Sequence, residues 1–256
     1  METKNIILEK KNHIAIITID HPPANAWDLA TTEEFEKVID LVEGDKEVRV
    51  VILTGAGERF FSAGFDVSDA GNAERIGAKG KELWTRIDRF AKPVIAAING
   101  HAMGGGLELA MCCHFRIMAD DPEFMLGLTE LNLGIIPGWG GTQRLPRLVG
   151  RAKALEMILF SKTMTAREAL EVGLVNRVAP PGKLMDDTLE FAGRLEQRPP
   201  IAVGWVLKAM SAGDYEGLER GLEVEADGSA AVRETKDREE GFKAFLEKRK
   251  PLFKGE

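Results

Sequence analysis

The sequence predicts an α/β fold with parallel strands, followed by a helical C-terminal part. Two short apolar runs, 50–53 and 94–98, are typical of strands that are buried on both faces of a sheet. A polar stretch with helical spacing, about 72–90, lies between them and supplies the crossover that parallel strands need. From Thr142 onwards most segments have helical spacing.

The composition indicates an ordered protein of one large or two small domains. The 256 residues are enough to bury a sizeable core. With 44% apolar and 29% charged residues, the chain has an ordinary balance that argues against disorder. Its formal net charge of −7 disfavours nucleic-acid binding.

Three features favour a cytoplasmic location. Residues 1–11 carry charges throughout and lack the apolar stretch of a secretory signal. No uninterrupted apolar run approaches the ~18 residues of a membrane span. Cys112 and Cys113 are too few and too close for a disulfide framework or a metal site of their own. We therefore expect a reducing compartment, no membrane and no metal.

The N-terminal part is expected to begin with two strands and a helix. Residues 5–8 and 14–19 have the β-branched character of paired strands. Thr31 and Glu34 have the spacing of a capping box, with Thr31 at the start of the helix. The apolar positions that follow at helical spacing are Phe35, Val38, Ile39 and Val42.

The C-terminal part is expected to be helical with one late strand. Helix starts are predicted at the caps Thr165 and Asp214 and at Pro199-Pro200. Residues 175–178 form the one plausible strand of this part. We therefore divide the chain into an α/β body and a helical extension that begins at about Asp187.

Three glycine-rich segments are candidates for binding a ligand, and the first two of them follow the predicted buried strands. They are FFSAGFD (60–66), NGHAMGGGLE (99–108) and GIIPGWGGTQRL (134–145). Glycines that open a helix let the backbone approach a ligand and aim free N–H groups at an anion. Taken singly, each segment is better explained by a tight turn or a close helix–sheet contact than by ligand binding. The chain contains neither a G-K-[ST] phosphate loop nor a G-x-S-x-G elbow.

Two carboxylates stand in apolar surroundings, which points to acid–base chemistry. Glu108 lies in a helix that is otherwise apolar, and Glu130 lies in GLTEL. Burial would raise the pKa of such acids into the range useful for catalysis. The alternatives are a helix N-terminal charge for Glu108 and a solvated turn for Glu130. Asp66 is best explained as a helix cap, and His101 and His114 as structural histidines.

The three segments together resemble the enoyl-CoA hydratase/isomerase (crotonase) superfamily. The motifs FSAGFD, NGHAMGGGLELA and LTELNLGIIPGWGGTQRL occur in the expected order, and the similarity covers nearly the whole chain. The resemblance implies a spiral core of repeated ββα units with the active site (1–186). It also implies a C-terminal helical region for oligomerisation and for covering CoA (187–256), in homotrimers that commonly pair into homohexamers.

The resemblance assigns a role to four residues. Phe65 and Gly105 match the positions whose backbone N–H groups form an oxyanion hole for the thioester carbonyl of an acyl-CoA. Glu108 and Glu130 match the two catalytic glutamates of the hydratases. The implied reaction is syn addition of water to the 2,3 double bond of an enoyl-CoA, which gives a 3-hydroxyacyl-CoA. No cofactor is expected, because coenzyme A enters as part of the substrate.

The resemblance also implies a path for the CoA moiety. The expected substrate-binding residues are Ala24, Ala26, Ala63, Phe65, Asp66, Val67, Ser68 and Gly105. The last sixteen residues, 241–256, carry a net charge of +3, which suits CoA phosphates contacted across a subunit interface. A solvated helix face is the alternative explanation of this basic segment.

Large aromatic residues occur where the family often has small ones. Phe65 and Trp139 are two such positions, and Trp27 follows the Ala24–Ala26 turn directly. We expect Trp27 and Trp139 to restrict the acyl pocket to short, branched or cyclic groups. The alternative is that both tryptophans pack in the core or at an interface.

Other functions within and outside this chemistry stay open from the sequence. An enoyl-CoA isomerase or a CoA-thioester hydrolase is the nearest alternative, although the presence of both Glu108 and Glu130 favours the hydratase. The superfamily also includes an RNA-binding member, but that role needs a basic stripe. A non-catalytic relative would be expected to lose one acid or the glycines, and this chain keeps both.

Overall fold

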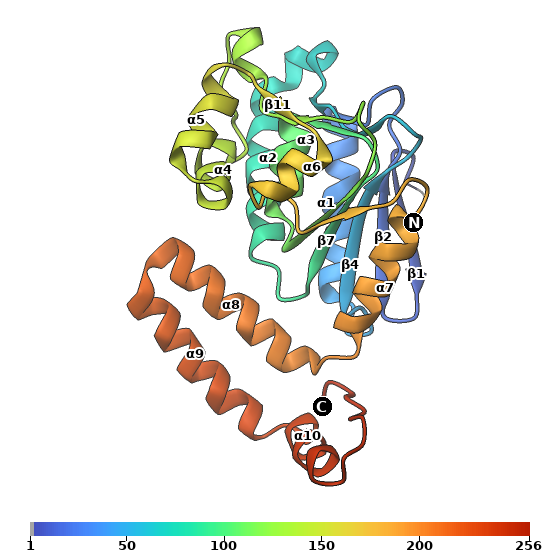
Figure 1. The fold of residues 1–256 in the computed structure, drawn as a ribbon, viewed down its shortest axis with the longest axis vertical. Helices are drawn as coiled ribbons and strands as arrows, with labels where there is room; N and C mark the ends of the chain where they lie inside the picture. Colours follow the sequence, from blue (N-terminus) through green and yellow to red (C-terminus); the bar gives the residue numbers. More distant parts are fainter. Residues whose placement is uncertain (1–2) are drawn as a thin grey trace.

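The computed structural model describes residues 3–256, which form an α/β body and a projecting helical part (Figure 1). The strands are β1 (Ile6–Lys11), β2 (Ile14–Ile19), β3 (Ala26–Trp27), β4 (Val50–Gly55), β5 (Phe60–Ser62), β6 (Gly64–Phe65), β7 (Val94–Ile98), β8 (His101–Met103), β9 (Phe115–Ala119), β10 (Leu126–Gly127), β11 (Thr163–Met164) and β12 (Arg177–Ala179). The α-helices are α1 (Leu29–Gly44), α2 (Ala73–Asp88), α3 (Gly105–Cys112), α4 (Gly141–Val149), α5 (Arg151–Leu159), α6 (Ala166–Glu171), α7 (Leu184–Glu196), α8 (Pro200–Glu216), α9 (Leu218–Arg233) and α10 (Lys236–Leu246). Two 3-10 helices, η1 (Val67–Asn72) and η2 (Glu130–Leu133), complete the elements. None of the helices in residues 3–256 has the length and apolar character needed to cross a membrane.

The strands form a spiral of repeated units around one main sheet. The main sheet has the order β1-β2-β4-β7-β9-β12, with every pair parallel except β1 and β2. A smaller sheet has the order β11-β10-β8-β5, and β3 pairs with β6. In each of two successive units, one strand joins the main sheet, the next joins the smaller sheet, and a helix follows: β4, β5 and α2, then β7, β8 and α3. The expected α/β fold of repeated ββα units is confirmed.

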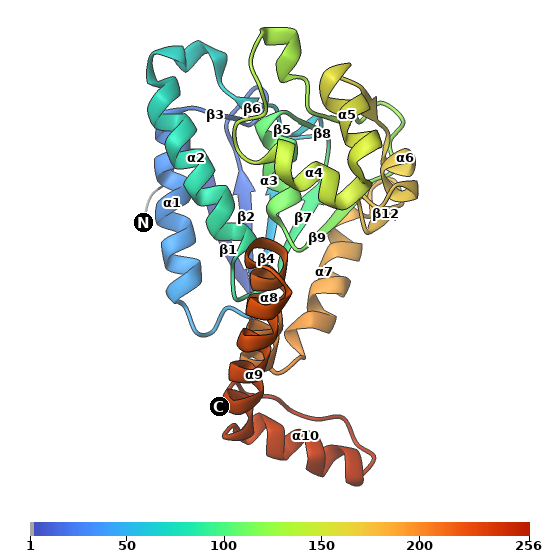
Figure 2. The same ribbon diagram turned by 90° about the vertical axis from the view of Figure 1, so that its left-hand side faces the viewer.

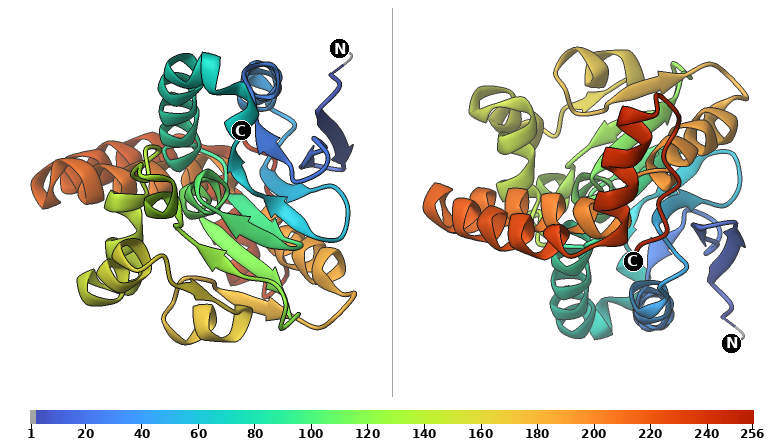
Figure 3. Two further views of the ribbon diagram at one scale, coloured as in Figure 1. Left: turned by 90° about the horizontal axis from the view of Figure 1, so that it is seen from above. Right: turned by 90° about the horizontal axis from the view of Figure 1, so that it is seen from below.

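The main sheet is buried on both faces, as its wholly apolar strands predict. Helices α1, α2 and α3 pack on one face and α7 on the other (Figure 3). Side chains alternate between the two faces along each strand, because successive residues of a strand point to opposite sides. In β4, Val51 and Leu53 face α1–α3, whereas Val50 and Ile52 face α7.

Four aromatic rings, those of Trp27, Phe35, Trp84 and Trp139, pack against one another beside α1 and α2. Trp27 is fully buried, and its ring lies edge-on to Phe35 and to Trp84 at centroid distances of 5.0 and 4.9 Å. Trp84 also contacts Trp139 at 5.0 Å. Aromatic pairs in such tilted arrangements add stabilisation to the burial of apolar area. This cluster therefore links the first helices of the body to the loop that precedes α4.

The C-terminal helices leave the body after α7. The boundary expected at 186/187 falls inside α7, which packs on β2, β4, β7 and β9 through Leu184, Leu189 and Ala192. Helices α8 and α9, which we call the helical arm (200–233), form an antiparallel pair that projects from the body (Figures 1 and 2). The part of the chain that stands away from the sheet therefore begins at Pro200.

Three local expectations need correction. Helix α1 begins at Leu29, and its cap is Asp28, which accepts a hydrogen bond from Thr31 N–H at 2.7 Å. The Glu34 carboxylate holds the N–H groups of residues 4 and 5, so it closes no capping box. Asp214 lies within α8, which ends before Gly217, where φ is +102°. The late strand is Arg177–Ala179 rather than 175–178. Val175 packs in the core, and only residues 177–179 pair with β9.

The other two predicted helix starts are confirmed. Thr165 and Glu168 form the complete capping box of α6. Pro200 is the first residue of α8, a position where proline loses no hydrogen bond because the helix has no partner for that N–H.

Candidate active site

All three glycine-rich segments contribute to one cavity of about 290 Å³. Its walls come from the end of β6, the start of α2, the start of α3, η2 and the loop before α4. The lining residues are Ala63, Phe65, Val67, Ala73, Gly77, Gly104, Gly105, Glu108, Thr129, Glu130, Leu133, Ile135, Ile136, Gly138 and Trp139. The structure therefore brings together both predicted acids and both predicted oxyanion-hole residues.

The first two segments meet because Gly64 has no side chain. A Cβ on Gly64 would lie 2.6 Å from the Gly105 nitrogen, and φ of Gly64 is +85°. The N–H of Gly105 is in the first position of α3, where a helix has no acceptor of its own. Asp66 N–H donates to the Trp27 carbonyl at 3.1 Å, and neighbouring N–H groups alternate along a strand. The Phe65 N–H therefore points away from β3, and β6 runs beside the start of α3.

Glu108 is buried in α3 and is held by the third segment. Glu108 is only 2% exposed to solvent. Its Oε1 accepts hydrogen bonds from Trp139 N–H at 2.8 Å and from Gly141 N–H at 2.7 Å. A Cβ on Gly141 would lie 3.0 Å from that oxygen, so glycine allows the approach. Both bonds use Oε1 and leave Oε2 for another partner. The two loop N–H groups therefore satisfy a carboxylate that stands in an otherwise apolar helix, and they fix its orientation.

Glu130 faces the same cavity from η2. Its residue is 9% exposed, and neither carboxylate oxygen has a hydrogen-bond partner within residues 3–256. Oε1 lies 3.1 Å from the position that a Cβ on Gly104 would occupy. A buried carboxyl group without a partner is costly, and such groups are typically found where a ligand or proton is handled. The alternative of a solvated turn is therefore wrong for Glu130.

The pKa values of both acids are raised, chiefly by burial. Burial, supported by the nearby Glu130, raises the pKa of Glu108 to about 7, against the lowering effect of the two loop N–H groups. Burial also raises the pKa of Glu130. Burial therefore favours the protonated form of both carboxyl groups more than in an exposed glutamate, and either group is placed to exchange a proton with a molecule in the cavity.

Trp139 forms a wall of the cavity. Its residue is 6% exposed, and its indole ring lies against Gly80 and Gly105, where a methyl group would collide with the ring. Its ring also contacts Trp84. Trp139 therefore lies at the cavity, where the sequence placed it, whereas its effect on the acyl group stays a prediction.

Comparison with known proteins decides the family. The profile described as enoyl-CoA hydratase/isomerase matches residues 9–256. The chain is 41% identical over 259 residues to the crotonyl-CoA hydratase of Syntrophomonas wolfei, covering 99% of each chain. The chain belongs to the enoyl-CoA hydratase/isomerase family.

Two further relatives agree with this membership. The short-chain-enoyl-CoA hydratase of Clostridium acetobutylicum is 41% identical over 256 residues, covering 98% of this chain and 97% of that one. The crystal structure of an enoyl-CoA hydratase from Bacillus anthracis has a TM-score of 0.94 at 40% identity, covering 99% of this chain and 100% of that chain. The crotonase-like fold therefore extends over the full length of this family member.

The residues expected along CoA lie partly in the cavity wall and partly around it. Ala63, Phe65, Val67 and Gly105 line the cavity. Ala24 and Ala26 lie beside it, since Ala63 N–H donates to the Ala24 carbonyl at 2.9 Å and β3 pairs with β6. Asp66 caps η1 by accepting from Ser68 N–H at 2.9 Å. Hydrogen bonding to Ser68, first through its side chain and then through its N–H, lowers the pKa of Asp66. Ser68 is exposed next to the exposed Val67.

Trp27 does not line the pocket of this family member. It is fully buried in the aromatic cluster, and its Nε1–H donates to Ser62 Oγ at 3.0 Å. Trp27 was expected in the pocket because it follows the Ala24–Ala26 turn in the sequence, but its side chain does not point towards the cavity. In a strand, neighbouring side chains point to opposite sides, and Trp27 points to the core.

Both histidines named in the sequence are structural. His101 Nδ1 accepts from Met125 N–H at 3.1 Å and His114 Nδ1 accepts from Val94 N–H at 2.9 Å. Burial lowers the pKa of His114 to about 4. Within residues 3–256, no group of three or more His, Cys, Asp or Glu side chains is placed to hold a metal ion.

Arg144 and the apolar rim of the cavity were not predicted from the sequence. Arg144 is 8% exposed and donates from Nη1 to the Trp139 carbonyl at 2.9 Å. Leu133, Ile135 and Ile136 border the opening although each is substantially exposed. Arg144 lies within the glycine-rich segment 134–145 and could have been noticed there, whereas the position of the rim residues depends on the loop conformation.

The buried charge of Glu108 predicts a pH-dependent effect on stability. Because the folded-state pKa is about 7 and the ordinary value is 4.5, the folded protein keeps a proton that the unfolded chain loses between these values. Stability from this group therefore falls as the pH rises to about 7. Glu108→Gln keeps the accepting oxygen and removes the charge, so it should raise the free energy of unfolding at about pH 8 by up to about 3 kcal/mol.

Denaturant unfolding at several pH values measures this effect. The gain should shrink towards zero as the pH falls below about 4, where Glu108 is mostly protonated in both states. The exposed Glu9 provides the matched control, since Glu9→Gln should change stability by no more than about 0.5 kcal/mol at any pH. A loss of stability in Glu108→Gln at high pH would show that the charge is not buried at a cost.

Proposed function

We propose that this protein is an enoyl-CoA hydratase that adds water to the 2,3 double bond of an enoyl-CoA to give a 3-hydroxyacyl-CoA. The observation that carries the proposal is one cavity lined by two buried carboxyl groups, Glu108 and Glu130, and by Phe65 at the end of β6 and Gly105 at the start of α3. The crotonyl-CoA hydratase and the short-chain-enoyl-CoA hydratase among the relatives support the same reaction.

The backbone N–H groups of Phe65 and Gly105 bind the thioester carbonyl oxygen. When a nucleophile attacks the β-carbon, the π electrons move to this oxygen and form an enolate. The two N–H groups are oriented by the close contact of Gly64 with α3, so they stabilise the developing charge without reorganising. The N-terminal end of α3 adds a favourable dipole.

The two glutamates handle the protons. Ionised Glu108 takes a proton from a water molecule, and the resulting hydroxyl forms the bond to the β-carbon. Protonated Glu130 then gives its proton to the α-carbon, which collapses the enolate and restores the thioester carbonyl. Both acids line the same cavity, so hydroxyl and proton reach one face of the double bond, which is syn addition. Proton exchange with solvent resets the pair, so the net reaction consumes one water.

The acyl group is short, branched or cyclic. Trp139 closes one side of the cavity, and its indole ring cannot move towards Gly105 or Gly80 without a collision. A cavity of about 290 Å³ shared with two carboxyl groups leaves little room for a long chain. The names of the two short-chain relatives agree with this restriction.

The protein assembles as a homotrimer or homohexamer, with CoA bound between copies. The helical arm and α10 carry exposed apolar side chains, namely Val206, Met210, Leu218, Leu222, Phe242 and Phe245. Surfaces of this kind support association. The basic segment 241–256 would lie on the CoA phosphates of a neighbouring copy. Sedimentation of the purified protein as a monomer would contradict this part of the proposal.

Replacement of either acid should abolish most of the hydration activity. We expect Glu108→Gln and Glu130→Gln each to lower kcat for crotonyl-CoA by about 10²–10⁴-fold, because each removes a proton-transfer group and keeps the shape. The loss of the ultraviolet absorbance of the enoyl thioester measures the rate. Glu9→Gln is the control and should retain full activity. Near-normal hydration in both folded variants, or a product with a shifted double bond and no added water, would contradict the proposal.

Removal of the Trp139 ring should widen the range of substrates. Trp139→Ala keeps the N–H that holds Glu108 and opens the wall of the pocket. We expect the ratio of kcat/KM for decenoyl-CoA to that for crotonyl-CoA to rise about tenfold or more. Trp205→Ala, on the helical arm, is the matched control and should leave the ratio unchanged. A wild-type enzyme that uses hexadecenoyl-CoA as well as crotonyl-CoA would exclude the short pocket.

A further inference from the structure

Tyr215, the only tyrosine of the chain, connects the helical arm to the body. It lies near the end of α8, and its hydroxyl donates a hydrogen bond to Asp88 Oδ2 at the end of α2. The Arg89 and Arg147 guanidinium groups lie 5.5 and 5.8 Å from the centre of its ring. Burial and the bond to Asp88 raise the pKa of Tyr215 to about 12, so the phenol keeps its proton near neutral pH.

The same oxygen of Asp88 holds Arg144 of α4. Arg144 Nε donates to Asp88 Oδ2 at 2.9 Å, and the side chains of Arg144 and Asp88 are only 9% and 18% exposed. Arg144 Nη1 then donates to the Trp139 carbonyl at 2.9 Å. The guanidinium lies directly against Gly140, whose φ of +107° and missing side chain make room for it. Arg144 is therefore fixed on one side by Asp88 and on the other by the loop.

That loop is the one that orients the catalytic base. The N–H groups of Trp139 and Gly141 donate to Glu108 Oε1, so the residues on both sides of Gly140 contact the carboxylate. A continuous series of polar contacts thus runs from Tyr215 through Asp88 and Arg144 to Trp139 and ends at Glu108. The four side chains in the series come from four different helices: α8, α2, α4 and α3.

We propose that Tyr215 is a positioning residue, which holds Asp88 and Arg144 so that the loop 137–141 keeps Glu108 in its working orientation. The helical arm thereby becomes part of the active-site support, although it lies outside the cavity. The kinetic consequence of this inference rests on the proposed hydratase function, whereas the structural consequence does not.

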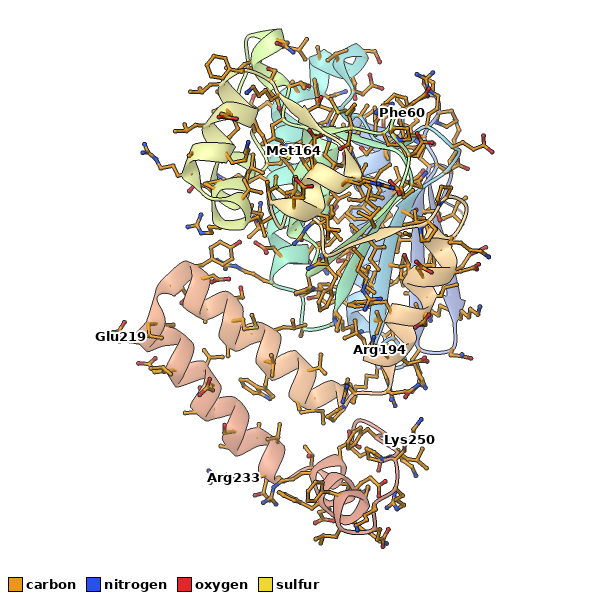
Figure 4. All side chains as sticks on the ribbon, in the orientation of Figure 1. Phe60, Met164, Arg194, Glu219, Arg233 and Lys250 are labelled. Atoms are coloured by element: carbon orange, nitrogen blue, oxygen red, sulfur yellow. The ribbon has the colours of Figure 1, made fainter. Side chains whose placement is uncertain are left out.

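The arm has few other contacts with the body that could do the same. The helices of the arm pack mainly on each other, with α9 on the outer side of α8, as the labelled Glu219 and Arg233 at its two ends show (Figure 4). Gly204 of α8 approaches the Ala91 carbonyl, where an added Cβ would lie at 3.0 Å. That contact does not involve Arg144 or the loop. Tyr215 is therefore the residue of the arm whose contacts lead towards Glu108.

Tyr215→Phe tests the inference with little risk to folding, because the ring between Arg89 and Arg147 is kept. Loss of a hydrogen bond to a charged group should make amide exchange in the segment 137–143 about tenfold faster. We expect kcat for crotonyl-CoA to fall about five- to tenfold with KM within about twofold of the wild type. Because Tyr215 acts through Asp88, Tyr215→Phe should cause no further loss in an Asp88→Asn background.

Asp120→Asn is the matched control for Asp88→Asn. Asp120 also accepts from an arginine, Arg167, but on an exposed surface away from the loop, so exchange in 137–143 and kcat should stay at wild-type values. Unchanged exchange of 137–143 in Tyr215→Phe would overturn the inference, whatever the activity. Faster exchange with an unchanged kcat would overturn the link to catalysis. If the wild type hydrates no enoyl-CoA, the proposed function fails, and exchange alone decides whether Tyr215 supports the loop.

Discussion

The structure of this family member is organised around a carboxylate that is buried at a cost. Glu108 is 2% exposed within an apolar helix, and burial raises its pKa to about 7. The glycine loop before α4 donates two N–H hydrogen bonds to it. Arg144 in turn donates a hydrogen bond to the Trp139 carbonyl of that loop. The same burial that costs stability gives a base whose pKa matches neutral pH.

Close approaches of backbone build the rest of the site. Gly64 lets β6 run against the start of α3, which brings Phe65 to the same cavity as Gly105. Gly105 leaves room for the Trp139 ring, and Gly141 leaves room for the Glu108 carboxylate. In each case a methyl group would meet backbone, a ring or a charged oxygen. The three glycine-rich segments therefore serve one purpose, which is to place two elements closer together than side chains would allow.

The α/β body and Glu108 could be predicted from sequence, because hydrophobic periodicity and apolar neighbours report burial directly. Phe65 and Gly105 were found only through a family resemblance, since a backbone N–H has no residue signature. Trp27 was placed wrongly, because adjacency in sequence does not tell which way a strand residue points. The Arg144–Asp88 and Tyr215–Asp88 contacts join residues 56 and 127 positions apart, so no local pattern could reveal them.

In the proposed hydration reaction, the buried and ionised Glu108 acts as the base. The most direct test is the pH dependence of kcat/KM for hydration of crotonyl-CoA by the wild-type enzyme, since this quantity reports the ionisation of the free enzyme. We expect an acidic limb with its midpoint near pH 7, below which the rate falls about tenfold per pH unit. A rate that stays level from about pH 8 down to about pH 5 would show that no group of this pKa must be ionised, and would contradict the account.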